Sequence, residues 1–257
     1  MNPLHRVLQE YLAVRRALGF KLERAGYLLP QFTAFLERQG TDTITTALAL
    51  RWAQKPSDAH PAWWAERLSI VRGFAKYLQT LDPRTEIPAA ELLPRQTRRT
   101  TPYLFSDRDL LQLMEATQKL RSRPPRATYA AFIGLLATTG MRVGEAIRLD
   151  RRDVDWENRV LVVRTSKFGK SREVPLHDST LEALRIYGRR RDQLHPRPKT
   201  PSFFLSSHGT RLIYSNVQHT FRALVRIAGL ELPATTRRQP RLHDLRHSFA
   251  VRTLLNW

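Results

Sequence analysis

Hydrophobic residues recur at helical spacing through the first 80 residues of this chain. Four such stripes predict four helices, and the first two end at Gly19 and Gly40, where glycine favours a C-terminal cap. The apolar positions are Leu4, Leu8, Tyr11, Leu12 and Leu18; Leu28, Leu29, Phe32, Phe35 and Leu36; those within Ile44–Ala53; and Trp64, Leu68, Val71, Ala75 and Leu78. We expect a small helical bundle whose core includes Trp52, Trp63 and Trp64.

The pattern changes where prolines become frequent after residue 81. The prolines in question are Pro83, Pro88, Pro94 and Pro102. Proline at this density disfavours helices and central strands, so residues 82–101 are predicted to be an extended, basic linker. The chain would then have a helical domain over residues 1–81 and a second domain over residues 102–257.

The second domain combines helical periodicity with two short alternating runs. Ser106 and Asp109 have the spacing of a capping box and predict the start of its first helix. Two strands, 160–163 and 173–176, are predicted to form a hairpin around a basic turn. Further helices are expected over residues 129–138, 179–191, 215–228 and 242–255. The expected fold is mostly α with a small antiparallel β-sheet, in two domains.

The net charge of the chain indicates the kind of partner that it binds. The 257 residues include 43 Lys and Arg against 23 Asp and Glu, a formal net charge of +20. Both halves share the excess, which favours a polyanionic partner, with nucleic acid first. The absence of cysteine excludes disulfides, thiolate nucleophiles and cysteine-ligated metal sites.

The distribution of apolar residues argues against a membrane or export role. The longest apolar stretch, around Ala130–Ala137, is far shorter than the roughly 20 residues that a membrane helix needs. The first residues lack the apolar region of a signal peptide. We therefore expect a soluble, cytoplasmic protein associated with the nucleoid.

Two arginines stand out by their surroundings. Arg142 follows Thr138-Thr139-Gly140, where one helix is expected to end and another to begin, and Arg246 lies in the last predicted helix. Two guanidinium groups can each give paired hydrogen bonds to one phosphate and can offset charge in a pentavalent transition state. Glu145 is one helical turn from Arg142 and could orient it, although a first-turn glutamate also suits the helix dipole.

The predicted hairpin turn carries a second cationic group. Lys167 could enter a DNA groove and protonate a leaving alkoxide, or it could be one charge of a turn that keeps a sheet edge soluble. Lys170 and Arg172 are candidates for phosphate contacts. Three arginines at the end of the proline-rich segment are further DNA-contact candidates: Arg95, Arg98 and Arg99.

Two histidines share a helix face with the second arginine. His243, Arg246 and His247 occupy positions i, i+3 and i+4, whereas Leu245 and Phe249 suit the core. The histidine spacing also occurs in two-histidine zinc helices, which makes a zinc hydrolase the alternative. An arginine beside the metal would repel it, and no third ligand is evident, so we expect no metal and no cofactor.

Three motifs together resemble those of the tyrosine recombinases, the phage-integrase family of site-specific DNA recombinases. They are Thr139–Glu145, Ser166–Leu176 and His243–His247. The resemblance implies a helical core-binding domain followed by a catalytic domain. It also implies that Arg142 and Arg246 bind phosphate, that Lys167 is the general acid and that His243 transfers a proton. Two residues would support them: Glu145 and His247.

The resemblance is incomplete after the third motif. The family carries a further His or Trp and then a nucleophilic tyrosine, but the 11 residues after Arg246 include no tyrosine. Tyr187 and Tyr214 precede that motif and match no nucleophile pattern. We therefore expect a C-terminally truncated recombinase without its nucleophile, or an inactive DNA-binding remnant that competes with an intact relative.

For a complete protein, the resemblance implies attack of the tyrosine on a DNA phosphodiester. The products would be a 3′-phosphotyrosyl intermediate and a free 5′-hydroxyl. The link conserves the bond energy, so the resemblance implies no cofactor. The partner would be double-stranded DNA, bound by a homo-tetramer.

Overall fold

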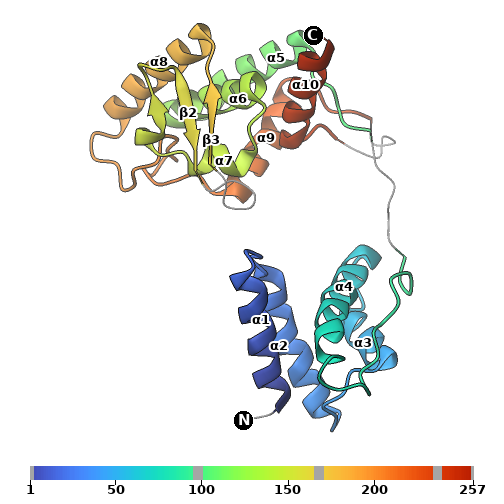
Figure 1. Ribbon diagram of the computed structural model, residues 1–257. Helices are drawn as coiled ribbons and strands as arrows, with labels where there is room; N and C mark the ends of the chain where they lie inside the picture. Colours follow the sequence, from blue (N-terminus) through green and yellow to red (C-terminus); the bar gives the residue numbers. More distant parts are fainter. Residues whose placement is uncertain (1–2, 95–100, 165–170, 234–238, 256–257) are drawn as a thin grey trace. The chain divides into compact units, whose positions relative to one another are not determined.

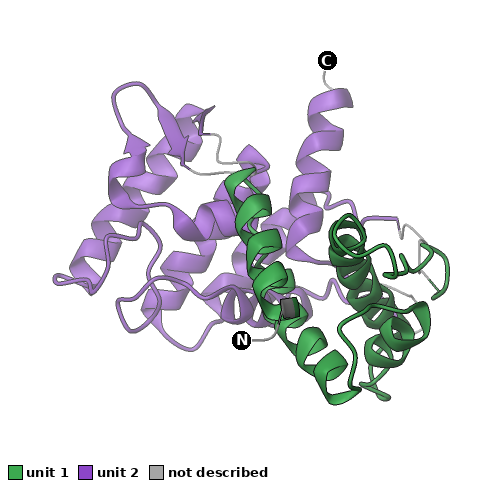
Figure 2. Ribbon diagram, turned by 60° about the horizontal axis from the view of Figure 1, so that its bottom comes forward, with its two compact units in different colours: residues 1–99 green, residues 100–257 purple. Residues whose placement is uncertain are grey.

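The computed structural model describes residues 3–94, 101–164, 171–233 and 239–255. The chain divides into two compact units, residues 1–99 and residues 100–257 (Figures 1 and 2). Both are rich in helix, and one small antiparallel sheet lies in the second unit, as the sequence predicts. None of the helices in the described ranges combines the length and the apolar character that crossing a membrane requires.

Unit 1 contains the four predicted helices. They are α1 (Pro3–Ala17), α2 (Glu23–Arg38), α3 (Thr46–Ala53) and α4 (Pro61–Leu78). Gly19 and Gly40 follow α1 and α2 with φ angles of 87° and 70°, in the left-handed region that glycine adopts without strain. The helices enclose an apolar core whose large side chains, such as Phe32 and Phe74, are fully buried.

The expectation that three tryptophans share this core is only partly right. Trp52 is buried, but Trp63 and Trp64 are partly exposed and pack at the edge of the core. Successive residues of a helix point about 100° apart, so neighbouring tryptophans on α4 cannot both face inward. The interior position is taken instead by the buried Arg67, which stacks over the Trp52 ring and donates to the Trp52 carbonyl at 2.8 Å.

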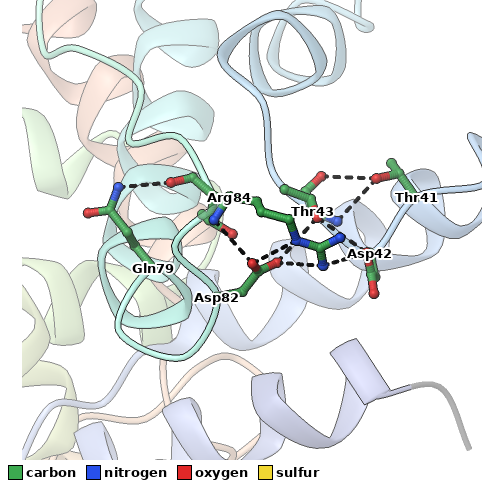
Figure 3. Close-up of polar contacts among 7 residues, drawn as sticks. Thr41, Asp42, Thr43, Gln79, Asp82 and Arg84 are labelled. Atoms are coloured by element: carbon green, nitrogen blue, oxygen red, sulfur yellow. Dashed lines mark hydrogen bonds and ion pairs between the residues drawn. The ribbon is translucent and has the colours of Figure 1, made fainter.

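The proline-rich segment has no helix or strand in its described part, residues 82–94, but it packs along unit 1. The Glu86 amide donates to the Ile44 carbonyl at 2.8 Å, and Leu93 is buried against the bundle. At its start, the Asp82 carboxylate accepts hydrogen bonds from Arg84 and from the Thr43 hydroxyl (Figure 3). Residues 82–94 are therefore part of the unit 1 packing.

Unit 2 combines several helices with the small sheet. Its helices are α5 (Asp107–Gln118), α6 (Arg123–Thr139), α7 (Val143–Arg148), α8 (Asp178–Leu194), α9 (Tyr214–Ile227) and α10 (Leu242–Leu255). α6 packs against α5, α8 and α10 (Figure 1). The predicted capping box is confirmed, because Ser106 and Asp109 exchange backbone-to-side-chain hydrogen bonds at the start of α5.

The sheet has the order β1-β2-β3, with β1 (Val154–Asp155), β2 (Val160–Val163) and β3 (Arg172–Pro175) all antiparallel to their neighbours. The predicted hairpin strands are confirmed, and Val163 pairs with Arg172 at the end nearest the turn. Leu161 and Val163 alternate with more exposed residues and are buried against the helices. β1 was not predicted, because two residues are too few to show alternation.

Candidate phosphate-binding site

The first candidate arginine lies at a helix junction. Gly140 ends α6 with φ 59° and ψ 21°, and Arg142 precedes α7 in an extended conformation with φ −73° and ψ 142°. The sequence expectation that Arg142 stands between two helices is confirmed. Its side chain is 44 % exposed, so the guanidinium group is accessible to a ligand.

Helix α10 docks closely on this junction. A Cβ atom on Gly140 would overlap the ring of Phe249, so only glycine allows this approach. The Arg246 guanidinium donates a hydrogen bond to the Gly140 carbonyl oxygen. This hydrogen bond fixes Arg246 to the main chain of the residue two positions before Arg142.

Glu145 ties the first arginine to the sheet. Its carboxylate is buried and accepts hydrogen bonds from the Arg142 main-chain N–H at 3.0 Å and from Arg142 Nη1 at 2.9 Å. It also accepts two from Arg172, Nη1 to Oε1 at 3.1 Å and Nη2 to Oε2 at 2.8 Å. A glutamate supporting Arg142 was expected. The pairing with Arg172, from a different element, could not be read from local spacing.

The charges of these groups act on one another. Partial burial lowers the pKa of Arg246 below its ordinary value, and repulsion from Arg142 and then Arg172 lowers it further, while Glu145 partly offsets the effect. The hydrogen bond from Glu145 raises the pKa of Arg172. Two guanidinium groups thus donate to one carboxylate, and Arg246 lies near enough for its charge to interact with theirs, an arrangement with surplus positive charge that suits an anion.

The two histidines of α10 lie edge to face, with ring centroids 4.8 Å apart. Burial lowers the pKa of His243 below its ordinary value, and the neighbouring charges of His247 and Arg246 lower it further against the opposing effect of Asp244. The imidazole is therefore mostly neutral near pH 7 and can accept a proton.

Two residues that no sequence pattern indicates, Asp244 and Ser248, anchor the same helix. Asp244 is fully buried, and its carboxylate accepts from the Arg241 main-chain N–H at 2.9 Å. The Ser248 hydroxyl accepts from the Phe105 N–H at 2.8 Å and donates to the Asp244 carbonyl. These buried polar groups fix the start of α10, and with it the positions of His243 and Arg246.

Metal binding gains no support from the geometry. Among the described residues, no group of three or more His, Asp or Glu side chains is placed to hold a metal ion. The pair His243 and His247 therefore has no third ligand in this part of the chain, as a zinc hydrolase would need.

Several predicted site residues lie outside the described residues. They are Lys167 and Lys170 in the hairpin turn, and Arg95, Arg98 and Arg99 in the proline-rich segment. For the turn, the structure describes the strands β2 and β3 on either side.

The tyrosines nearest in sequence to α10 differ in environment. Tyr187 is buried in α8, where its hydroxyl lies 3.2 Å from Thr128 Oγ1 and accepts the Leu205 N–H at 3.2 Å. Burial raises the pKa of the Tyr187 hydroxyl, which opposes its use as a nucleophile. Tyr214 is exposed at the start of α9.

Replacing Tyr187 with phenylalanine is expected to lower the free energy of unfolding by about 1–3 kcal/mol, because the buried Leu205 N–H loses its acceptor. DNA affinity should not change. Urea unfolding and a DNA titration measure the two effects. Unchanged stability, or weaker DNA binding by a stably folded variant, would contradict this structural role.

Comparisons with known proteins place the chain in a family. A protein-family model described as "Phage integrase family" matches residues 104–256. A putative integrase/recombinase of Sinorhizobium fredii, y4rB, is 46 % identical over 263 residues, covering all of this chain and 83 % of the relative. The tyrosine recombinase XerD of Rhizobium meliloti is 33 % identical, over 75 % of this chain and 61 % of its own length.

Solved structures share the fold. The Tn1549 transposon integrase in complex with a circular intermediate DNA aligns with a TM-score of 0.66 at 19 % identity, covering 97 % of this chain and 87 % of the other. XerH bound to its difH substrate after cleavage aligns with a TM-score of 0.60 at 21 % identity, covering 83 % and 60 %. With the family match over most of unit 2 and the relatives along the whole chain, this protein belongs to the phage integrase family of tyrosine recombinases.

Proposed function

We propose that this chain binds duplex DNA and holds one phosphodiester between Arg142 and Arg246 for attack by a tyrosine. Family membership supports a DNA breaking and rejoining enzyme of site-specific recombination. The observation that carries the finer proposal is the sharing of the Glu145 carboxylate between Arg142 and Arg172, together with the hydrogen bond that holds Arg246 at the Gly140 carbonyl, two residues before Arg142 in the chain.

The two arginines would act on the charge that develops during the reaction. A guanidinium group donates in a planar fork that matches two phosphate oxygens, and the two groups come from separate elements, Arg142 just before α7 and Arg246 within α10. Attack on phosphorus adds negative charge to the non-bridging oxygens, so fixed donors stabilise the transition state more than the ground state.

Proton transfer is assigned to two further residues. The attacking tyrosine hydroxyl would lose its proton to His243, whose neutral imidazole can accept it. The bond from phosphorus to the 5′-oxygen breaks as the phosphotyrosyl bond forms, and Lys167 would protonate the leaving oxygen. The assignment of Lys167 rests on its place in the sequence motif.

We infer that the nucleophile lies outside these 257 residues. No tyrosine follows Arg246, and Tyr187 is bonded within the core. The chain alone would then bind DNA without forming a 3′-phosphotyrosyl link. If no tyrosine is supplied, it would act as a DNA-binding competitor of an intact relative.

The proposed substrate also sets the partners and the place of action. Duplex DNA is the main partner, on the nucleoid in the cytoplasm. A homo-tetramer on DNA is proposed by analogy, since the structural neighbours include a lambda integrase tetramer bound to a Holliday junction.

DNA affinity is expected to fall steeply with salt. A protein with about six phosphate contacts loses roughly a thousandfold in affinity between 50 and 200 mM salt, because bound counterions are released. Replacing Arg95, Arg98 and Arg99 with glutamine should lower the slope of log affinity against log salt by about three. Titrations of a labelled duplex measure both effects.

Arg84 provides the control. Its guanidinium is already paired with Asp82 and Asp42, so Arg84→Gln should leave the slope unchanged. Duplex binding that is absent at low salt, or insensitive to salt, would overturn the DNA-binding proposal.

A further inference from the structure

Beyond the proposed phosphate site, we propose that Arg172 is a positioning residue that compensates the charge of Glu145 and so leaves the charge of Arg142 available to a phosphate. The inference rests on the proposed function and assigns Arg172 a role different from direct contact with DNA. It follows from the way one buried carboxylate is shared between two guanidinium groups.

Each oxygen of the Glu145 carboxylate accepts one hydrogen bond from Arg142 and one from Arg172. Glu145 Oε1 accepts from Arg142 Nη1 at 2.9 Å and from Arg172 Nη1 at 3.1 Å. Oε2 accepts from the Arg142 main-chain N–H at 3.0 Å and from Arg172 Nη2 at 2.8 Å. The Glu145 side chain is 2 % exposed, so water contributes little to stabilising its charge. The fork-to-fork pairing with Arg172 supplies that stabilisation.

The charge balance gives this pairing a consequence for ligand binding. A carboxylate paired with Arg142 alone would cancel the charge that a phosphate needs. With Arg172 as a second partner, the group of two guanidiniums and one carboxylate keeps one net positive charge. Arg246, which is hydrogen-bonded to the Gly140 carbonyl two residues before Arg142, lies beside this group. Burial lowers the pKa of Arg246, and the charges of Arg142 and Arg172 lower it further against the opposing charge of Glu145.

Arg172 also connects two parts of the fold. It is the first residue of β3 and pairs across the hairpin with Val163, whereas Glu145 lies in α7. The ion pair therefore joins the strand that follows the predicted lysine-bearing turn to the helix that begins beside Arg142. Both Nη atoms of Arg172 donate to Glu145, so the guanidinium group is oriented by the carboxylate.

A similar ion pair nearby supplies a matched control. Arg164 follows β2, and its Nε donates at 2.7 Å to Asp153, whose side chain is 6 % exposed. This pair also joins a guanidinium to a buried carboxylate at the same sheet, but neither partner contacts Arg142 in the described contacts.

The test is a titration of the 257-residue protein with inorganic phosphate, followed by the NMR signals of the Arg142 and Arg246 side-chain Nε–Hε groups. Arg172→Gln should weaken phosphate affinity about tenfold, the effect of one partly screened charge a few ångströms away. Arg172→Gln combined with Glu145→Gln should recover most of the phosphate affinity, because no carboxylate then compensates the charge of Arg142. Arg172→Lys should also retain most of it.

Arg164→Gln should stay within about twofold of the wild type while losing a comparable amount of thermal stability. Equal phosphate affinities for Arg172→Gln and Arg164→Gln would overturn the role of Arg172. A double variant as weak as Arg172→Gln would do the same and would indicate a direct ligand. No response of Arg142 or Arg246 to phosphate in the wild type would instead overturn the proposed function, and the inference with it.

Discussion

Gly140→Ala is expected to destabilise unit 2 by about 3 kcal/mol. A left-handed backbone costs a non-glycine residue about 1–2 kcal/mol, and overpacking in a tight contact adds about 1–3 kcal/mol. Both terms apply, because Gly140 has φ 59° and an added Cβ would overlap the ring of Phe249. Relief of the overlap would move α10 and Arg246 away from Arg142. Urea unfolding measures the stability, and the phosphate titration measures the effect on the site.

The same substitution elsewhere is expected to have the opposite sign. Gly188 lies inside α8, and a Cβ there would meet nothing within 4 Å. Gly188→Ala should therefore stabilise the protein by about 0.5–1 kcal/mol, through the lower helix propensity of glycine. If Gly140→Ala proved as stable as Gly188→Ala, the close docking of α10 on the helix junction would be wrong.

Most of the helices could be predicted because their signals are local. Apolar residues at helical spacing, the glycines after α1 and α2, and the capping box of Ser106 and Asp109 all act within a few residues of one another. β1 escaped prediction because Asp155 and its neighbour Val154 form a strand only by pairing with β2.

In the candidate site, too, only the residues that belong to local sequence motifs could be predicted. Arg142, Glu145 and Arg246 could be proposed from sequence motifs, and the structure brings them together. The partnership of Arg172 with Glu145 joins residues 27 positions apart, so no local pattern indicates it. The burial of Asp244 was also missed, because a charged residue on a helix usually faces solvent.

In the proposed function, Arg142 and Arg246 hold a phosphodiester for a tyrosine outside these 257 residues. The suitable substrate is a nicked duplex that carries a site selected by the protein from random DNA. A protein extended past Trp257 with a C-terminal segment that supplies a nucleophilic tyrosine should form a covalent adduct on this duplex. Arg142→Ala or Arg246→Ala should slow adduct formation by at least a hundredfold while sparing most DNA binding. Arg164→Gln, which removes the ion pair with Asp153 and leaves the hydrogen bonds of Arg142 in place, is the control.

The most direct measurement compares the 257-residue chain with the extended protein on this nicked duplex, scored as a slowly migrating protein–DNA band. We expect the extended protein to give the adduct and residues 1–257 to bind the duplex without one. Slow hydrolysis is the most that water could achieve in place of the oriented tyrosine. An adduct formed by residues 1–257 and lost in Tyr214→Phe or Tyr187→Phe would contradict the account, as would an adduct that survives in the extended protein when both arginines are replaced.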